Sequence, residues 1–194
     1  MESLVKDRYS KDEIKEFFEM LYFEELEKKS LYIHTLFTQN KQTLALAESC
    51  TGGLLSYFLT IKEGASVFFL GSVVGYSYLA KMRSLDIPSK VLKEKGAVNQ
   101  SVCRLMAQGI KKKWDSDWAM AITGVAGPGR MERDPEVGVV FIGVLGPDCD
   151  EVAPFLLDKK NRQDIRHQSA IFALDFLQSR IKIGGKIKKE VSYE

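Results

Sequence analysis

The sequence predicts a single α/β domain of three layers (α/β/α), in which helices cover both faces of a mixed, mostly parallel sheet of about five strands. Two observations favour this fold class. Short apolar runs alternate with segments in which apolar residues recur every three or four positions, the pattern of strands alternating with helices. The 194 residues suffice for one sizeable core, and no second compositional block or internal repeat marks another domain.

An extra N-terminal helix precedes the domain. Ser10 and Glu13 have the spacing of a capping box, which predicts a helix start. We expect this helix to break near residues 28–30 and to end at the 40–42 turn. The apolar residues that recur at helical spacing along it are Ile14, Phe17, Phe18, Leu21, Leu26, Ile33, Leu36 and Phe37. We interpret residues 1–24 as a helical extension of a domain that spans residues 25–181.

The first half of that domain alternates clearly between strand and helix patterns. Residues 43–47 are typical of a buried strand, and residues 52–62 continue with a helical pattern. Residues 66–75 are apolar and β-rich with a glycine at their end, which favours a second strand. Two short helices over 78–83 and 90–95 follow, the second beginning after Pro88 and closed by Gly96.

The second half repeats this alternation. A helix over 100–114 carries its apolar residues on one face, and strands follow at 117–123, 137–145 and, more weakly, 152–157. The run 137–145 is almost continuously apolar, which is typical of a central strand. A Gly/Pro loop fills 124–135. A last helix over 162–181 leads into a Lys-rich tail, residues 182–194, which we expect to be flexible.

Composition excludes several classes of protein. The net charge of +2 argues against nucleic acid as a partner. The three cysteines are odd in number and widely spaced, which favours neither a disulfide framework nor a thiolate metal site. The N-terminus lacks the apolar core of a signal peptide, and no apolar run approaches the roughly 18 residues of a membrane span. We therefore expect a cytoplasmic protein with no membrane partner.

The segment 47–53, Ala-Glu-Ser-Cys-Thr-Gly-Gly, stands between a strand and a helix start. This position places hydroxyl and backbone N–H groups at the positive end of a helix dipole, where an oxyanion is stabilised. Ser49 is therefore a candidate nucleophile. Taken alone, the commoner role of Ser49 and Thr51 is helix capping, at about 1 kcal/mol each.

A nucleophilic serine needs a base. His34 lies in the leading helix and His167 stands alone beside an arginine, so lysine or tyrosine is the better candidate. Tyr76, Tyr78 and Lys81 follow the strand 66–75, at the sheet edge where α/β folds bind ligands. A lysine base needs its pKa lowered by about 3 units, roughly 4 kcal/mol of desolvation or charge repulsion. The simpler alternative is a solvent-facing lysine.

Two further segments suggest an anion site. Thr123 and Gly124 open the glycine-rich loop that follows a strand, where exposed N–H groups bind phosphate or carboxylate. Arg162 and Arg166 are four residues apart and share one helix face. Cations at a helix N-terminus are unfavourable unless an anion balances them, which mildly favours an anionic ligand. A surface loop and a solvated basic helix end are the simpler alternatives.

Taken in order, these motifs resemble the CinA C-terminal domain family, the nicotinamide-nucleotide amidases of pyridine nucleotide salvage. The motifs are Ala-Glu-Ser-Cys-Thr-Gly-Gly, Tyr-Ser-x-x-Ala-Lys, Gly-Ala-Val, Ile-Thr-Gly-Val-Ala-Gly-Pro, Val-Gly-x-Val and Arg-x-x-x-Arg, within residues 30–180. The resemblance implies a compact α/β/α fold without a metal or cofactor. It also implies hydrolysis of the carboxamide of nicotinamide mononucleotide, which yields nicotinic acid mononucleotide and ammonia.

The resemblance also implies roles for individual residues. Ser49 would be the nucleophile, Lys81 its general base, and Tyr78 or Tyr76 an aid to proton transfer. Backbone N–H groups would form an oxyanion hole, and other residues would hold the substrate in place. Arg166 above all would bind its phosphate. This substrate-binding set is Thr51, Gly52, Gly53, Thr123, Gly124, Arg162 and Arg166.

Two alternatives remain from the sequence. Residues 130–135 are charged where the family usually continues with more glycine and a Lys-Pro, so the chain would alternatively be a nucleotide-binding or interaction protein without activity. The apolar stripe of the N-terminal helix would dock on the core or on another subunit, and we expect a homo-oligomer.

Overall fold

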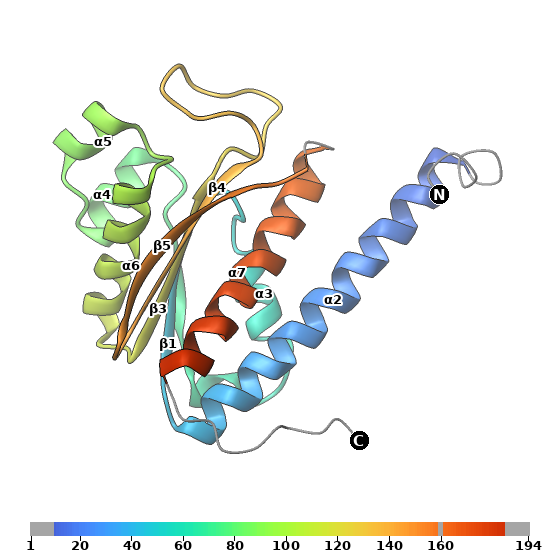
Figure 1. Cartoon of the computed structure of the whole chain (residues 1–194), viewed down its shortest axis with the longest axis vertical. Coiled ribbons are helices and arrows are strands. Elements are labelled where there is room, and N and C mark those ends of the chain that lie inside the picture. Colours follow the sequence, from blue (N-terminus) through green and yellow to red (C-terminus); the bar gives the residue numbers. More distant parts are fainter. Residues whose placement is uncertain (1–9, 159–160, 185–194) are drawn as a thin grey trace.

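A five-stranded mixed sheet forms the centre of the structure, a computed structural model that describes residues 10–158 and 161–184 (Figure 1). The strand order is β2-β1-β3-β4-β5. The strands are β1 (Leu44–Glu48), β2 (Phe69–Val74), β3 (Trp118–Gly124), β4 (Val139–Gly146) and β5 (Cys149–Leu156). All five occur in the segments where the sequence predicted strands, β5 beginning three residues early.

Strand pairing divides the sheet into a parallel and an antiparallel part. β1 lies between β2 and β3 and is parallel to both, whereas β3/β4 and β4/β5 are antiparallel. The sheet is therefore mixed as predicted, with its pairings evenly split rather than mostly parallel. The two-residue connection between β4 and β5 permits only a hairpin, which accounts for one of the two antiparallel pairings. The apolar strand β4 is an interior strand next to the β5 edge.

Helices cover both faces of the sheet, which confirms the predicted three layers (Figure 1). One face carries α4 (Tyr78–Leu85), α5 (Ser89–Lys95) and α6 (Gln100–Trp114), and the other carries α2 (Lys11–Asn40), α3 (Leu54–Leu59) and α7 (Arg162–Gly184). Each layer encloses its own apolar cluster against the sheet. Both faces of the interior strands are thus shielded from water.

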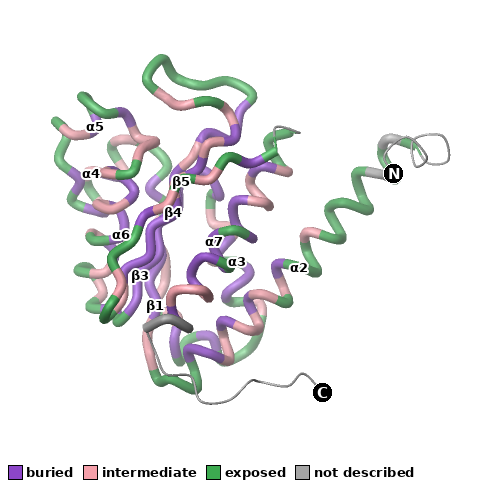
Figure 2. The backbone as a smooth tube through the Cα atoms, in the orientation of Figure 1, coloured by how far each residue is buried: buried purple, intermediate pink, exposed green. Residues whose placement is uncertain are grey.

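The long helix α2 changes character along its length. It begins at the predicted capping box, in which Ser10 Oγ accepts from Glu13 N–H and the Glu13 carboxylate accepts from Ser10 N–H. The break expected near 28–30 is absent, because Ser30 faces the core and donates to the carbonyl of Glu27 in the preceding turn. Figure 2 shows buried residues in the second half of α2, where they alternate with partly exposed ones, and most of the first half exposed.

Several other boundaries differ from the sequence prediction. α3 begins at Leu54 rather than 52, because Gly52 and Gly53 both have positive φ. The predicted strand 66–75 opens as a 3₁₀ turn, Ala65–Val67, and becomes strand at Phe69. α7 continues to Gly184, and residues 185–194 of the predicted tail lie outside the described residues. Within the described ranges, no helix has both the length and the apolarity required to traverse a bilayer.

The sheet topology brings the candidate residues to one edge. β1, β2 and β3 are parallel, so their carboxyl ends meet at the upper edge of the sheet in Figure 1. The Ser49 turn follows β1, the segment that leads into α4 follows β2, and the glycine-rich loop follows β3. Ligands of open α/β sheets bind at this edge.

The fold generates a prediction about the N-terminal extension. Phe17 and Met20 are 54% and 49% exposed, and the aromatic contacts that the described residues 10–24 make with the rest of the chain are Tyr22 with His167 and Phe23 with Phe58. Removal of residues 1–24 should therefore preserve the fold and lower the free energy of unfolding by about 1–3 kcal/mol, the sum of two aromatic contacts. Urea unfolding followed by circular dichroism measures this, and loss of a cooperative transition would contradict it.

Candidate active site

A tight turn between β1 and α3 presents Ser49. Gly52 N–H donates to the carbonyl of Ser49 at 3.1 Å, and Gly52 and Gly53 take the left-handed φ values of 63° and 98°. Residues with a Cβ avoid this conformation. A Cβ on Gly52 would also lie 3.3 Å from the guanidinium of Arg166. Glycine is therefore required here by the backbone turn and by the neighbouring arginine.

Glu48 holds this turn together. Its side chain is completely buried and accepts five hydrogen bonds. The donors and distances are Thr51 Oγ1 (2.7 Å), Gly53 N (3.0 Å), Leu55 N (3.3 Å), Ser56 N (2.9 Å) and Ser56 Oγ (2.5 Å). The capping function considered for Ser49 and Thr51 is thus carried out by Glu48. This role of Glu48 was not predicted from the sequence, although a lone acid at the end of a buried apolar strand was a signal for it.

Lys81 contacts the hydroxyl of Ser49, which is not needed for capping α3. The lysine lies in α4, whose N-terminus is capped by Ser77, and its side chain is fully buried. Its Nζ donates to Ser49 Oγ at 2.9 Å and to the carbonyl of Gly75 at 2.5 Å. The distance to Ser49 lies within the 2.6–3.2 Å typical of a nucleophile and its base. Ser49 and Lys81, 32 residues apart in sequence, therefore meet at the sheet edge, as expected from their positions after two strands.

Burial lowers the pKa of the Lys81 amine from 10.5 to about 8, while Cys50 and Asp134 partly counteract this effect by raising it. The cause is the loss of hydration, which disfavours the charged form. Near pH 8 about half of the amine is neutral and able to accept a proton. Most of the shift that a lysine base requires is therefore present in the folded chain.

Cys50, next to Ser49, does not compete as a nucleophile. Burial raises the pKa of its thiol to about 12, although hydrogen bonds from the N–H groups of Cys50 and Thr51 and the charge of Lys81 oppose that rise. A thiol that remains protonated at neutral pH is a poor nucleophile. The neighbouring hydroxyl of Ser49 is the group that faces the amine.

The expected oxyanion donors are only partly available. Gly53 N–H donates to Glu48, and Gly52 N–H closes the turn on Ser49. Of the expected donors Thr51, Gly52 and Gly53, this leaves the N–H of Thr51, which donates neither to the Glu48 side chain nor to the Ser49 carbonyl.

The two tyrosines lie on different sides of the pair. Tyr78 opens α4 one turn before Lys81, and its hydroxyl lies 3.9 Å from where a Cβ of Gly96 would stand. Tyr76 is 57% exposed and accepts a hydrogen bond from Arg162 at 2.6 Å. Within the described part of the chain, neither hydroxyl hydrogen-bonds to Ser49 or Lys81.

Two arginines at the start of α7 donate hydrogen bonds to the loops that surround Ser49 and Lys81. Arg162 also donates to the carbonyl of Gly127 at 2.7 Å. Arg166 donates to the carbonyl of Thr51 at 2.7 Å and to Gln163 at 2.8 Å. The predicted Arg-x-x-x-Arg face is therefore directed at the site rather than at bulk solvent.

Thr123 and Gly124 occupy the end of β3. The buried hydroxyl of Thr123 donates to the carbonyl of Ala97 at 3.0 Å. A Cβ on Gly124 would approach a methyl of Val140 to 2.7 Å. Close packing of β3 on β4 is thus a sufficient reason for the glycine, and Thr123 fixes the loop that follows α5.

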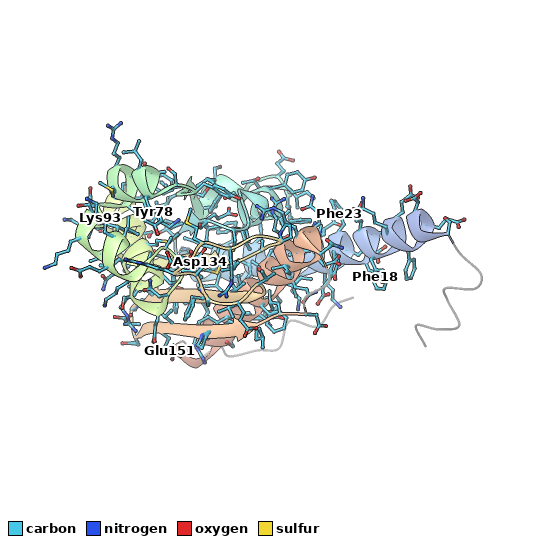
Figure 3. All side chains as sticks on the ribbon, turned by 90° about the horizontal axis from the view of Figure 1, so that it is seen from above. Phe18, Phe23, Tyr78, Lys93, Asp134 and Glu151 are labelled. Atoms are coloured by element: carbon cyan, nitrogen blue, oxygen red, sulfur yellow. The ribbon has the colours of Figure 1, made fainter. Side chains whose placement is uncertain are left out.

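The charged loop 130–135 is docked on the α5 end. Arg133 donates to the carbonyls of Lys93 and Glu94, and Arg130 donates to the carbonyl of Asp134 at 3.0 Å. Figure 3, viewed from above, shows Asp134 between the layer that carries Tyr78 and the layer that carries Phe23. This position agrees with the effect of Asp134 on the pKa of Lys81.

Both histidines lie in apolar or aromatic surroundings. His34 packs edge-on against Phe68 with ring centroids 5.3 Å apart, and His167 stacks on Tyr22 at 5.2 Å. Burial, followed by the charge of Arg166, lowers the pKa of His167. Among residues 10–158 and 161–184, no histidine hydrogen-bonds to Ser49, and no three His, Cys, Asp or Glu side chains form a potential metal site.

Comparison with known sequences identifies relatives of this site. A family model described as the CinA C-terminal domain matches residues 26–181. A CinA-like protein of Parasynechococcus marenigrum (strain WH8102) is 40% identical over 147 residues, and one of Prochlorococcus marinus (strain MIT 9301) is 42% identical over 143 residues. The alignments cover 75% and 73% of this chain but 35% and 34% of the relatives. The chain thus spans about a third of their length.

Solved structures share the fold. The competence-damaged protein (CinA) superfamily protein of Escherichia coli superposes with a TM-score of 0.77 at 26% identity, over 80% of this chain and 90% of that chain. The competence/damage inducible protein of Agrobacterium tumefaciens gives 0.73 at 30% identity, over 80% of this chain and 94% of that chain. The three-layer architecture is therefore the architecture of these proteins.

The buried amine predicts an unusual dependence of stability on pH. Because the pKa of Lys81 is about 8 in the folded chain and 10.5 ordinarily, the unfolded chain binds more protons between these values. The free energy of unfolding should thus rise by about 3 kcal/mol as the pH increases from 8 to 10.5, relative to Lys81→Met. The burial penalty is fully present below pH 8. Urea unfolding at several pH values tests this, and parallel curves for the two proteins would contradict it.

Proposed function

The chain belongs to the CinA C-terminal domain family, and we propose that it hydrolyses the carboxamide of nicotinamide mononucleotide to nicotinic acid mononucleotide and ammonia. The observation that carries this proposal is the buried Lys81 amine, 2.9 Å from Ser49 Oγ. A serine hydroxyl beside a partly neutral amine is suited to acyl transfer. Names such as CinA-like protein specify no activity, so the reaction rests on this chemistry and on the motifs.

The first half of the proposed reaction forms an acyl-enzyme. Neutral Lys81 takes the proton of Ser49 Oγ, which attacks the carboxamide carbon and forms a tetrahedral oxyanion. We propose that N–H groups of the turn, that of Thr51 among them, and the newly charged ammonium of Lys81 stabilise that oxyanion. A preorganised donor of this kind contributes about 3–4 kcal/mol.

The second half releases both products. The ammonium of Lys81 returns its proton to the leaving nitrogen, and ammonia departs as the carbon–nitrogen bond breaks. Water then attacks the ester, with Lys81 again accepting the proton, and Ser49 leaves as the hydroxyl. Tyr78 and Tyr76 remain candidates for assisting these proton transfers. Each step uses only groups of the chain, the substrate and water.

Arg162 and Arg166 are the proposed contacts for the phosphate of the substrate. Both guanidinium groups lie at the N-terminus of α7 and currently donate to neutral acceptors, namely the carbonyls of Gly127 and Thr51, the hydroxyl of Tyr76 and the side-chain amide of Gln163. Phosphate is a stronger acceptor for a guanidinium, and the helix dipole adds to its attraction. Binding the phosphate away from Ser49 would orient the carboxamide for attack.

A second candidate function is nucleotide binding without turnover. The observation that favours it is the charged loop 130–135, which Arg133 fixes against α5 beside the site. If this loop blocks the approach of the carboxamide to Ser49, the chain would bind the mononucleotide but release no ammonia from it. Calorimetry would then detect the binding.

The first prediction for this function concerns Ser49. The purified chain should release ammonia from nicotinamide mononucleotide, and more slowly from nicotinamide riboside, which lacks the phosphate. Ser49→Ala should reduce the rate at least about 1,000-fold without changing the fold, because the covalent step is lost. An ammonia-coupled assay and circular dichroism measure both. An active Ser49→Ala enzyme would rule out this nucleophile, and binding without turnover by the unchanged chain would favour the second candidate.

The pH dependence of activity gives a separate test of Lys81. Because the base must be neutral, kcat/KM should rise about tenfold per pH unit below 8 and level off above it. Asp134→Asn removes a charge that raises the pKa of Lys81, so its midpoint should move to lower pH. Glu132→Gln, in the same exposed loop, serves as the control. A midpoint that stays fixed in Asp134→Asn would contradict the assignment.

A further inference from the structure

We propose that Glu48 is the positioning residue for Ser49, acting through the turn that it holds and not by contact with substrate. Its role in catalysis rests on the proposed function. The evidence is the completely buried carboxylate that accepts hydrogen bonds from Thr51, Gly53, Leu55 and Ser56. These donors lie on both sides of the glycine pair, so one side chain closes the turn and starts α3.

The pattern of donors requires a carboxylate rather than an amide. Oε1 accepts from the N–H and hydroxyl of Ser56, and Oε2 accepts from the hydroxyl of Thr51 and the N–H groups of Gly53 and Leu55. A carboxylate is an acceptor at both oxygens, whereas glutamine carries an NH₂ group at one end. In either orientation, a glutamine NH₂ would face at least two donors. Glu48→Gln therefore disrupts the turn while nearly preserving the size of the side chain.

Glu48 also fixes the other partner of the lysine. Its backbone carbonyl accepts from Gly75 N–H at 2.8 Å, and the carbonyl of Gly75 accepts from Lys81 Nζ. The carboxylate of the same residue orders the turn that carries Ser49. One buried residue is thus linked to the hydroxyl through its side chain and to the amine through its backbone.

A short hydroxyl chain extends the network to β2. Ser56 Oγ lies 2.5 Å from Glu48 Oε1 and 2.6 Å from Ser72 Oγ. A hydroxyl has one proton, and the carboxylate can only accept. Ser56 therefore donates to Glu48, and Ser72 donates to Ser56. The turn is in this way tied to the strand whose end leads to Lys81.

The test measures the reactivity of Ser49 without relying on the nicotinamide substrate. A fluorophosphonate probe reports it, because Ser49 Oγ bonds to phosphorus, fluoride leaves, and Lys81 takes the proton. Glu48→Gln should label about 10- to 100-fold more slowly than the unchanged chain, as expected for a nucleophile displaced by about 1 Å. With the amide substrate, kcat should fall by a similar factor while KM changes less, since the proposed phosphate contacts Arg162 and Arg166 lie on α7 and not in the turn.

Three further variants complete the design. Ser56→Ala removes one donor to Oε1 and keeps the carboxylate. Labelling of Ser49 should therefore slow by less than in Glu48→Gln, about threefold. Ser72→Ala should have a still smaller effect. Ile181→Val, a buried change in the final turns of α7, is the control for lost stability and should label at the unchanged rate.

The outcomes separate the two proposals. A folded Glu48→Gln variant that labels at the unchanged rate overturns the positioning role. If that variant does not fold, an unchanged labelling rate in Ser56→Ala overturns it instead. If no labelling of Ser49 is found in the unchanged chain, Ser49 is not an activated nucleophile and the positioning role falls with it. Labelling of Ser49 without ammonia release would contradict only the proposed substrate.

Discussion

The site depends on one contact, between the buried amine of Lys81 and the hydroxyl of Ser49 at 2.9 Å. Each part of the fold serves that contact. The parallel pairing of β1 and β2 brings the two strand ends to the same edge, and α4 directs the lysine back across it. The helices on both faces exclude water, and desolvation is the main cause of the lowered pKa of the amine. Without burial, the same two groups would form an ordinary hydrogen bond to a permanently charged lysine.

The second constraint is that a buried acid and a buried base stand close together in the fold without forming an ion pair. The Glu48 carboxylate accepts hydrogen bonds from the turn and from α3. Lys81 Nζ donates instead to Ser49 Oγ and to the carbonyl of Gly75. An ion pair between them would raise the pKa of the lysine and lower its use as a base. Hydrogen-bond donors of the turn take the place of a cation for Glu48. The pKa of the amine therefore stays near 8, and a neutral fraction of the amine is available near neutral pH.

Much of the fold and the centre of the site could be predicted because they depend on local patterns. Apolar periodicity placed the strands, and the ends of parallel strands brought Ser49 and Lys81 together. The role of Glu48 could not be predicted, since its five donors meet it only after the turn closes. The continuity of α2 past Ser30 likewise depends on tertiary burial rather than on propensity. The β4/β5 hairpin, one of the two antiparallel pairings, was hidden because polar residues begin β5.

A purely structural role does not account for Lys81. Burying an amine that has two neutral hydrogen-bond partners, and no carboxylate among them, costs the folded chain stability whenever the amine is charged. A methionine of similar length would fill the same space without this penalty. Lys81 weakens the fold at neutral pH and lies at a sheet edge beside a hydroxyl. Such a residue is characteristic of a functional site, where stability is lost in favour of reactivity. The lowered pKa and the stability deficit are therefore two consequences of the same burial, and the variant that removes one should remove the other.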